Sequence, residues 1–120
     1  MTGTVNIGGA AVPMRADGST PYKYAAIHGS SRDLVQMLYN GTEDDAGFID
    51  MMTRLAYTMN VQAAEDLDPG SLGEKDFVAW CADFGPTDLI AAAPEIYRFY
   101  RYQAEPSSEA KKKSGEPSGK

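Results

Sequence analysis

The sequence predicts a mainly α-helical domain of the α+β class, with about five to six helices, an N-terminal β-hairpin and a disordered C-terminal tail. Three patterns support this prediction. Apolar and polar residues alternate at the start of the chain, apolar residues recur at helical spacing through its middle, and residues 103–120 contain almost no apolar side chains. A chain of 120 residues usually forms one domain.

The N-terminal alternation predicts two strands, over residues 4–7 and 10–15. The pair Gly8-Gly9 between them can adopt the positive φ angles of a two-residue hairpin turn. Pro13 has no N–H to donate, so its strand must lie at an edge or direct that position outward. Because an isolated hairpin is only marginally stable, we expect it to pack on the helices that follow.

Capping residues mark the first two helices. Thr20-Pro21 supplies an N-cap and a first-turn proline for a helix over about 21–28, which Gly29 would end. The segment from Ser30 to Asp33 resembles a capping box and predicts a second helix that ends at Asn40-Gly41.

The longest helix is expected over about 45–66, where apolar residues at 48, 52, 55 and 59 share one face and form the centre of the core. Asp68-Pro69-Gly70 predicts a turn. A capping box from Ser71 to Glu74 then predicts a further helix that carries Phe77, Trp80, Cys81 and Phe84 and ends at Gly85.

The last helical segment contains a proline. Because the ring of Pro94 would clash with the preceding turn, we expect a short helix at 87–92 and a separate one at 94–102. We therefore place the helical domain at residues 1–102. Residues 103–120 are rich in Pro, Ser, Gly, Glu and Lys and cannot bury enough surface to offset their ordering entropy, so a disordered tail is expected there.

Charge and composition exclude several classes of function. The formal net charge is -6, and the segment 1–102 carries 14 acidic and 7 basic residues. An acidic body is a poor partner for nucleic acid. A single cysteine excludes an internal disulfide framework and a multi-thiolate metal site. We expect no signal peptide and no membrane span, because the start lacks a basic and an apolar region and the longest aliphatic run is Leu89 to Ala93.

No group of residues predicts catalysis, a metal site or a cofactor. His28 is the only histidine, and its place before Gly29 favours a bond to the last carbonyls of its helix. Cys81 shares a face with aromatic residues and is expected to be a buried, inert thiol. Glu43-Asp44-Asp45 lacks the spacing of a calcium loop and is expected to be a solvated helix start.

Aromatic and methionine residues are the best candidates for a protein contact. Most should lie in the core, but the aromatic residues of 96–102 cover more than one face of their helix, and such a helix is either buried or partnered. Methionines suit adaptable interfaces. The candidate protein-binding residues are Met52, Met59, Tyr97, Tyr100 and Tyr102.

The sequence resembles the tail assembly chaperones of long-tailed phages and prophages of Gram-positive bacteria. Its opening VNIGGAAVPMRADGSTPYKYAAIHG is similar to the family's I-x-I-G-G-x-x-x-P-[LM/F]-R-x-[TD] segment and following short helix. Further family motifs are similar to Leu55 to Ala63, Phe77 to Phe84, and Pro94-Glu95-Ile96-Tyr97. The likeness covers about residues 4–102, and the order, spacing and total length of the motifs carry it.

The resemblance implies a non-enzymatic role in the host bacterial cytoplasm. Proteins of this family bind the tape-measure protein during tail assembly, help recruit major tail (tube) protein subunits and are absent from the finished virion. Many relatives also have a longer form made by ribosomal frameshifting, and an adenine-rich stretch coding for Lys111 to Lys113 would suit such a shift. Partners implied are therefore the tape-measure protein, the tube protein, an extended form of the chain and further copies of it.

Three other readings remain open. A structural head–tail connector or tail terminator would form a stable ring. An acidic inhibitor that mimics nucleic acid would need regularly spaced surface carboxylates, whereas the acids here cluster at helix starts and turns. A small enzyme would need a convergent set of titratable groups.

Overall fold

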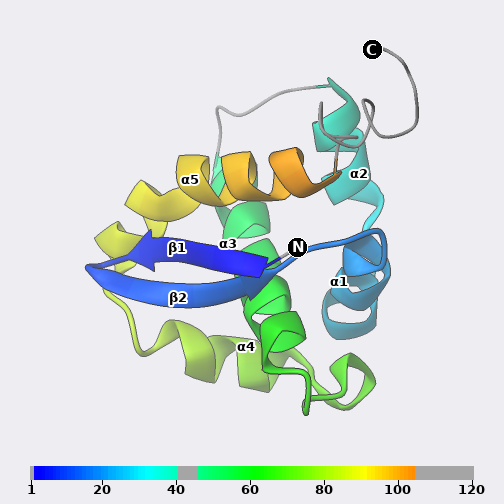
Figure 1. Ribbon diagram of the computed structural model, residues 1–120, viewed down its shortest axis with the longest axis horizontal. Helices are drawn as coiled ribbons and strands as arrows, with labels where there is room; N and C mark the ends of the chain where they lie inside the picture. The colour runs from blue at the N-terminus through cyan, green and yellow to red at the C-terminus, as the bar shows by residue number, and fades with distance from the viewer. Residues whose placement is uncertain (1, 41–45, 105–120) are drawn as a thin grey trace.

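The computed structural model describes residues 2–40 and 46–104, which form a two-stranded antiparallel hairpin and five α-helices (Figure 1). In chain order the elements are β1 (Thr2–Ile7), β2 (Ala10–Arg15), α1 (Thr20–His28), α2 (Arg32–Asn40), α3 (Ala46–Ala64), the short 3-10 helix η1 (Pro69–Ser71), α4 (Glu74–Cys81) and α5 (Pro86–Ala104). The predicted α+β class, hairpin and number of helices are confirmed.

The hairpin lies across α3, and α5 runs along β1 in the opposite direction (Figure 1). Gly8 and Gly9 form the turn with φ angles of 61° and 88°, and Ile7 pairs with Ala10 beside it. The apolar residues of both strands point to the helices, because side chains alternate between the two faces of a strand. Those buried are Val5, Ile7, Val12 and Met14.

Helix side chains cap the outer edges of both strands. Pro13 lies on β2, and its carbonyl accepts a hydrogen bond of 2.8 Å from Asn60 Nδ2 of α3. Trp80 Nε1 of α4 donates to Asn60 Oδ1 at 3.1 Å. On β1, the backbone N–H of Asn6 donates to Glu95 Oε2 of α5 at 3.1 Å. These bonds fix the hairpin between three helices and satisfy backbone groups that the two-stranded sheet leaves unpaired.

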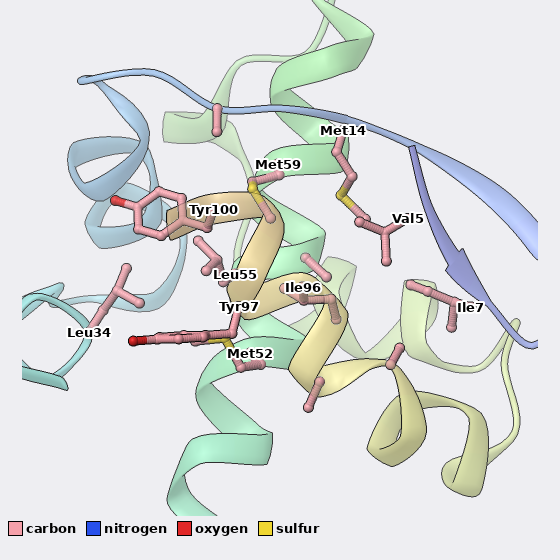
Figure 2. Packing of buried hydrophobic residues seen from close by; sticks show 14 of the residues in the cluster. Val5, Ile7, Met14, Leu34, Met52, Leu55, Met59, Ile96, Tyr97 and Tyr100 are labelled. Carbon is pink, nitrogen blue, oxygen red and sulfur yellow. The ribbon is translucent and has the colours of Figure 1, made fainter. Parts of the chain in front are cut away.

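One core cluster joins the hairpin, α3 and the carboxyl-terminal half of α5. Leu55, Met59 and Ile96 are fully buried at its centre (Figure 2). A second, smaller cluster joins α1, α3 and α4 through Ile27, Tyr57, Val61 and Phe77. The long helix α3 takes part in both clusters, so its expected place at the centre of the core is confirmed.

Two predictions about the start of α4 are wrong: the residues that cap the helix, and the residue at which it begins. The expected capping box of Ser71 and Glu74 does not form, because Asp68 to Ser71 closes its own turn, in which Ser71 Oγ donates to the Asp68 carbonyl at 2.8 Å. The helix begins two residues later than that box implies, and the Gly73 N–H donates to Asp76 Oδ2 at 2.9 Å.

The predicted break at Pro94 is wrong, because α5 is one helix from Pro86 to Ala104. Because Pro94 has no N–H, the carbonyl of Ile90, four residues earlier, receives no helical hydrogen bond from it. Pro94 and Ile90 are both exposed, so the proline ring and this carbonyl lie on the solvent side of the helix. Ala92 and Ala93 before it and Ile96 after it are buried. Their packing holds both halves of the helix on the same core, which offsets the cost of the proline.

Helix α5 extends through residue 104, two residues beyond the domain boundary expected at 102. The rest of the predicted tail, from residue 105 on, lies outside the described residues. None of the helices in residues 2–40 and 46–104 is long and apolar enough to cross a membrane.

Candidate protein-binding surface

Four of the five predicted contact residues are core residues. Met52, Met59, Tyr97 and Tyr100 have exposed fractions of 4% or less. The rings of Tyr97 and Tyr100 extend from α5 toward the side of the core where Leu34 of α2 lies (Figure 2). The surface position expected for them is therefore wrong. The aromatic residues of α5 cover several faces because the helix is enclosed by β1, α3 and residues of α2, all in the same cluster. Only Tyr102, with 70% of its area exposed, lies on the surface.

Tyr97 illustrates this enclosure. Its ring meets Phe48 of α3 edge to face, with 5.7 Å between centroids. Arg101 Nη1 donates a 2.6 Å hydrogen bond to its hydroxyl, so both the apolar ring and the polar end of Tyr97 have partners. Burial raises the pKa of the neighbouring core residue Tyr100 to about 12.

A groove between α2 and the start of α3 is the best candidate for a protein contact. We call it the α2–α3 groove; its volume is about 310 Å³. Its lining combines an apolar floor with polar groups at the sides: Asp33, Gln36, Met37, Asn40, Gly47, Phe48 and Met51. Met37 and Phe48 belong to the core, whereas Met51 is half-buried and remains reachable.

A second hollow of about 350 Å³ continues the groove toward α1. The two share Asp33, Gly47 and Met51, and the second also reaches Asp50 and Arg54. The combined surface thus offers flexible apolar side chains flanked by carboxylates. The predicted contact residue Met52 faces the core, and the adjacent Met51 faces the groove, because neighbouring helical residues lie about 100° apart.

Helix α2 also exposes apolar side chains away from the groove. Val35 and Tyr39 lie one turn apart, with exposed fractions of 48% and 90%. At about 100° per residue, both lie about 120° or more around the helix from Asp33 and Met37. This helix therefore presents apolar groups on its outer flank as well as in the groove.

Charged groups beside the second hollow hold three helices together. The guanidinium of Arg54 on α3 donates two hydrogen bonds to the carboxylate of Glu74 on α4, at 2.7 and 3.1 Å. Its Nε donates a third, of 3.0 Å, to the carboxylate of Asp50. The Arg54 guanidinium also lies over the Phe77 ring, 4.7 Å from its centroid. Because Arg54 stabilises the charged form of Glu74, the pKa of Glu74 is lowered.

His28 belongs to this group, and its expected role at the end of its own helix is wrong. Gly29, at φ 99°, closes α1 by donating its N–H to Ala25. The His28 ring instead crosses to α3, where Nε2 lies 3.1 Å from the Arg54 carbonyl and Nδ1 lies 3.3 Å from Arg54 Nη1. The neutral ring with a proton on Nε2 satisfies both contacts. Burial is the main reason that the pKa of His28 is lowered.

The other residues considered for chemistry take structural positions. Cys81 is half-buried beside the second core cluster, and burial raises the pKa of its thiol, which disfavours the reactive thiolate. Within residues 2–40 and 46–104, no three His, Cys, Asp or Glu side chains gather as a metal site would require. The acids Glu43 to Asp45 and the lysines 111–113 lie outside the described residues.

Comparison with protein-family models finds no matching family. Comparisons with curated proteins and with solved structures likewise find no significant match.

Proposed function

We propose that the protein is a tail assembly chaperone of a long-tailed phage or prophage. In this proposal it binds helical segments of the tape-measure protein in the host cytoplasm, helps recruit tube subunits, has no enzymatic activity and does not enter the virion. The observation that carries the proposal is the α2–α3 groove, in which Met37 and Met51 lie beside Asp33. An amphipathic helix could place its apolar side chains on these methionines.

The chemistry of the groove suits reversible binding of varied segments. Methionine side chains are flexible and polarizable, so they adapt to apolar groups of different shapes. Carboxylates at Asp33 and Asp50 would attract lysine or arginine residues beside the apolar face of a client helix. The excess of acidic residues in segment 1–102 would keep a complex with an aggregation-prone client in solution.

The motifs behind the family resemblance meet one another at the two edges of the hairpin. Asn60 of the Leu55–Ala63 motif joins Pro13 of the opening segment to Trp80 of the Phe77–Phe84 motif. Glu95 of the last motif bonds the backbone of Asn6. These motifs therefore contact one another across the fold. The support for the chaperone activity is the groove.

Co-expression with the tape-measure protein of the same phage tests the proposal. The wild-type chain should keep that protein in the soluble fraction. Met51→Lys places a charged group in the groove and should lower the soluble yield of the client severalfold. Val78→Lys is the matched control, because Val78 is an apolar residue of α4 with 56% of its area exposed and does not line the groove. Circular dichroism would establish that both variants are folded.

Each outcome has a defined meaning. An insoluble client beside the wild-type chain would contradict the chaperone function. A soluble client with the wild-type chain and equal loss, or equal retention, in both variants would retain the function but remove the groove as its site. A closed ring formed by the chain alone, with no client bound, would favour the connector or terminator alternative.

A further inference from the structure

A third cavity, separate from the α2–α3 groove and the second hollow, lies where β2, α1 and the end of α3 meet. Its volume is about 260 Å³. It is lined by Arg15, Lys23, Val61, Gln62, Glu65, Leu67 and Pro69. No lining residue is shared with the α2–α3 groove, so an inference from this pocket is independent of the proposed function.

The pocket contains a buried hydrogen-bond donor that has no acceptor. Gln62 is 6% exposed, and its Nε2 has no hydrogen-bond partner among the described residues. Its Oε1 accepts the hydroxyl proton of Thr20 at 2.8 Å, and that hydroxyl already accepts the Asp17 N–H at 2.9 Å. In this arrangement the Thr20 hydroxyl gives its proton to the amide oxygen of Gln62, so the Nε2 end of the amide has to find its acceptor elsewhere.

The unpaired amide calls for an acceptor oxygen. A buried N–H without a partner costs more free energy than a hydrogen bond usually provides, so such groups rarely stay unmatched. Asp17 does not fill this role. Bonds from Ser19 are the main reason that the pKa of Asp17 is lowered to about 2, and the nearby Gln62 amide lowers it further. The contact between the Gln62 amide and Asp17 does not have the geometry of a full hydrogen bond, so Nε2 remains without a well-placed acceptor.

Two cationic residues line the same pocket. Arg15 and Lys23 each provide N–H donors, so together with Gln62 the pocket presents three donor side chains. Arg15 Nη1 lies 3.3 Å from Glu65 Oε2, and Arg15 Nε lies 3.9 Å from Asp17 Oδ2. A ligand oxygen with negative charge would suit this set better than a neutral one.

Glu65 occupies one side of the arginine and can be displaced. Its side chain is 72% exposed, and an ion pair so exposed contributes little stability. Its backbone has φ 63°, the left-handed conformation that favours glycine. A carboxylate from a ligand could take the place of the Glu65 carboxylate beside Arg15 and reach the amide of Gln62.

The remaining wall of the pocket is apolar. Val61 and Pro69 line it, together with Leu67, whose side chain is half exposed. These residues would contact aliphatic carbon next to the charged group. We propose that this pocket binds an aliphatic carboxylate, supplied either by a glutamate side chain or by the terminal carboxylate of a chain.

Nuclear magnetic resonance can observe the proposed acceptor directly through the side-chain N–H signals of Gln62 in the full chain. The probes are N-acetyl-leucine, which mimics a chain end, and N-acetyl-glutamate α-amide, which keeps its side-chain carboxylate and mimics a glutamate side chain. Acetyl-leucine amide is the control, because it has the apolar group without the carboxylate. A saturable downfield shift with a carboxylate probe, but not with the control, is expected, and the probe that binds more tightly identifies the source.

Variants test which side chains hold the carboxylate. Arg15→Gln should weaken binding about tenfold or more, because a charge-assisted hydrogen bond is lost. Glu65→Gln removes the internal competitor and should tighten binding about twofold to fivefold. Asp83→Asn is the control for net charge, since it changes the charge equally at an exposed position that does not line the pocket. It should leave the affinity within the error of the wild type.

Three results would overturn the proposal. One is the absence of a saturable shift at Gln62 for either carboxylate up to concentrations on the order of tens of millimolar; water alone would then satisfy the amide. Another is an equal response to the amide control. The third is an equal gain in affinity in Glu65→Gln and Asp83→Asn, which would assign the effect to overall charge and not to this pocket.

Discussion

The carboxylate of Glu95 accepts a hydrogen bond of 3.1 Å from the backbone N–H of Asn6, although the two residues are 89 positions apart in the chain. This bond ties the last helix to the outer edge of the first strand. It occupies a backbone group that could otherwise pair with a strand of another molecule. Phe99 of the same helix lies beside Gly3, where an added Cβ would approach its ring to 2.7 Å. Helix α5 thus contacts β1 at its edge through Glu95 and on its packed face through Phe99.

Glu95→Ala should lower the free energy of unfolding by about 1 kcal/mol, because one hydrogen bond from a backbone N–H to a charged group is lost. Glu95→Gln should retain most of the stability, since its amide oxygen can accept the same bond. Urea denaturation monitored by circular dichroism would measure both. Equal stability of the alanine variant and the wild type would show that the edge bond contributes nothing in solution.

The buried position of His28 predicts a pH dependence. Its folded-state pKa lies below the unfolded value of about 6.5, so the unfolded chain binds the proton first as the pH falls. The stability from the neutral ring is therefore fully present above about pH 6.5 and is lost as the pH falls toward the folded-state pKa. Protonation would also set a cation against Arg54 and remove the acceptor at Nδ1, although Asp50 and Glu74 lie nearby.

Urea titrations of the wild type and His28→Gln at pH 7.5 and 5.5 would test this expectation. The wild type should lose more stability than the variant between the two values. Asp17 cannot account for the difference, because its pKa is lowered to about 2 and its contribution to stability is lost only below the ordinary aspartate pKa of 3.8. Parallel losses in the two proteins would assign the pH dependence to other groups.

The tyrosines of α5 should respond to truncation according to burial. Tyr97→Ala and Tyr100→Ala should each destabilise the fold by about 3–5 kcal/mol, because each leaves a large cavity in the core. Together they would unfold a domain whose total stability is about 5–10 kcal/mol. Tyr102→Ala should change the stability by less than about 0.5 kcal/mol. Thermal denaturation of the three single variants would check this order, and a large loss at Tyr102 would contradict it.

The proline within α5 offers a stabilising substitution. Pro94→Ala restores an N–H for the carbonyl of Ile90 and should raise the free energy of unfolding by about 1 kcal/mol, less than the full cost of proline in a helix because the site faces solvent. Pro86→Ala is the control, since a proline at the first helical position replaces no bonded N–H. A decrease for Pro94→Ala would mean that the core is built around the altered helix geometry.

Local patterns predicted most of the fold because they depend on neighbouring residues. Gly8-Gly9 needs positive φ angles, and apolar spacing in α3 places Leu55 and Met59 on one face. The prediction failed where distant contacts decide the outcome. The helix across Pro94 is held by packing of Ile96 on the core, and His28 turns toward Arg54, a residue 26 positions away.

The candidate surface was harder to predict for the same reason. Aromatic richness in α5 indicated either burial or a partner, and only the arrangement of β1, α3 and α2 around it decides for burial. The groove depends on the approach of α2 to the start of α3, which no pattern within either helix specifies.

The most direct test of the chaperone proposal is the mass of the species that the purified chain forms with the tape-measure protein of its phage. Size-exclusion chromatography with light scattering measures that mass for the chain alone and for the mixture. The proposal predicts a soluble species that contains both proteins and that Met51→Lys weakens. A mixture in which the tape-measure protein precipitates, while the chain elutes unchanged or as a closed ring, would contradict it.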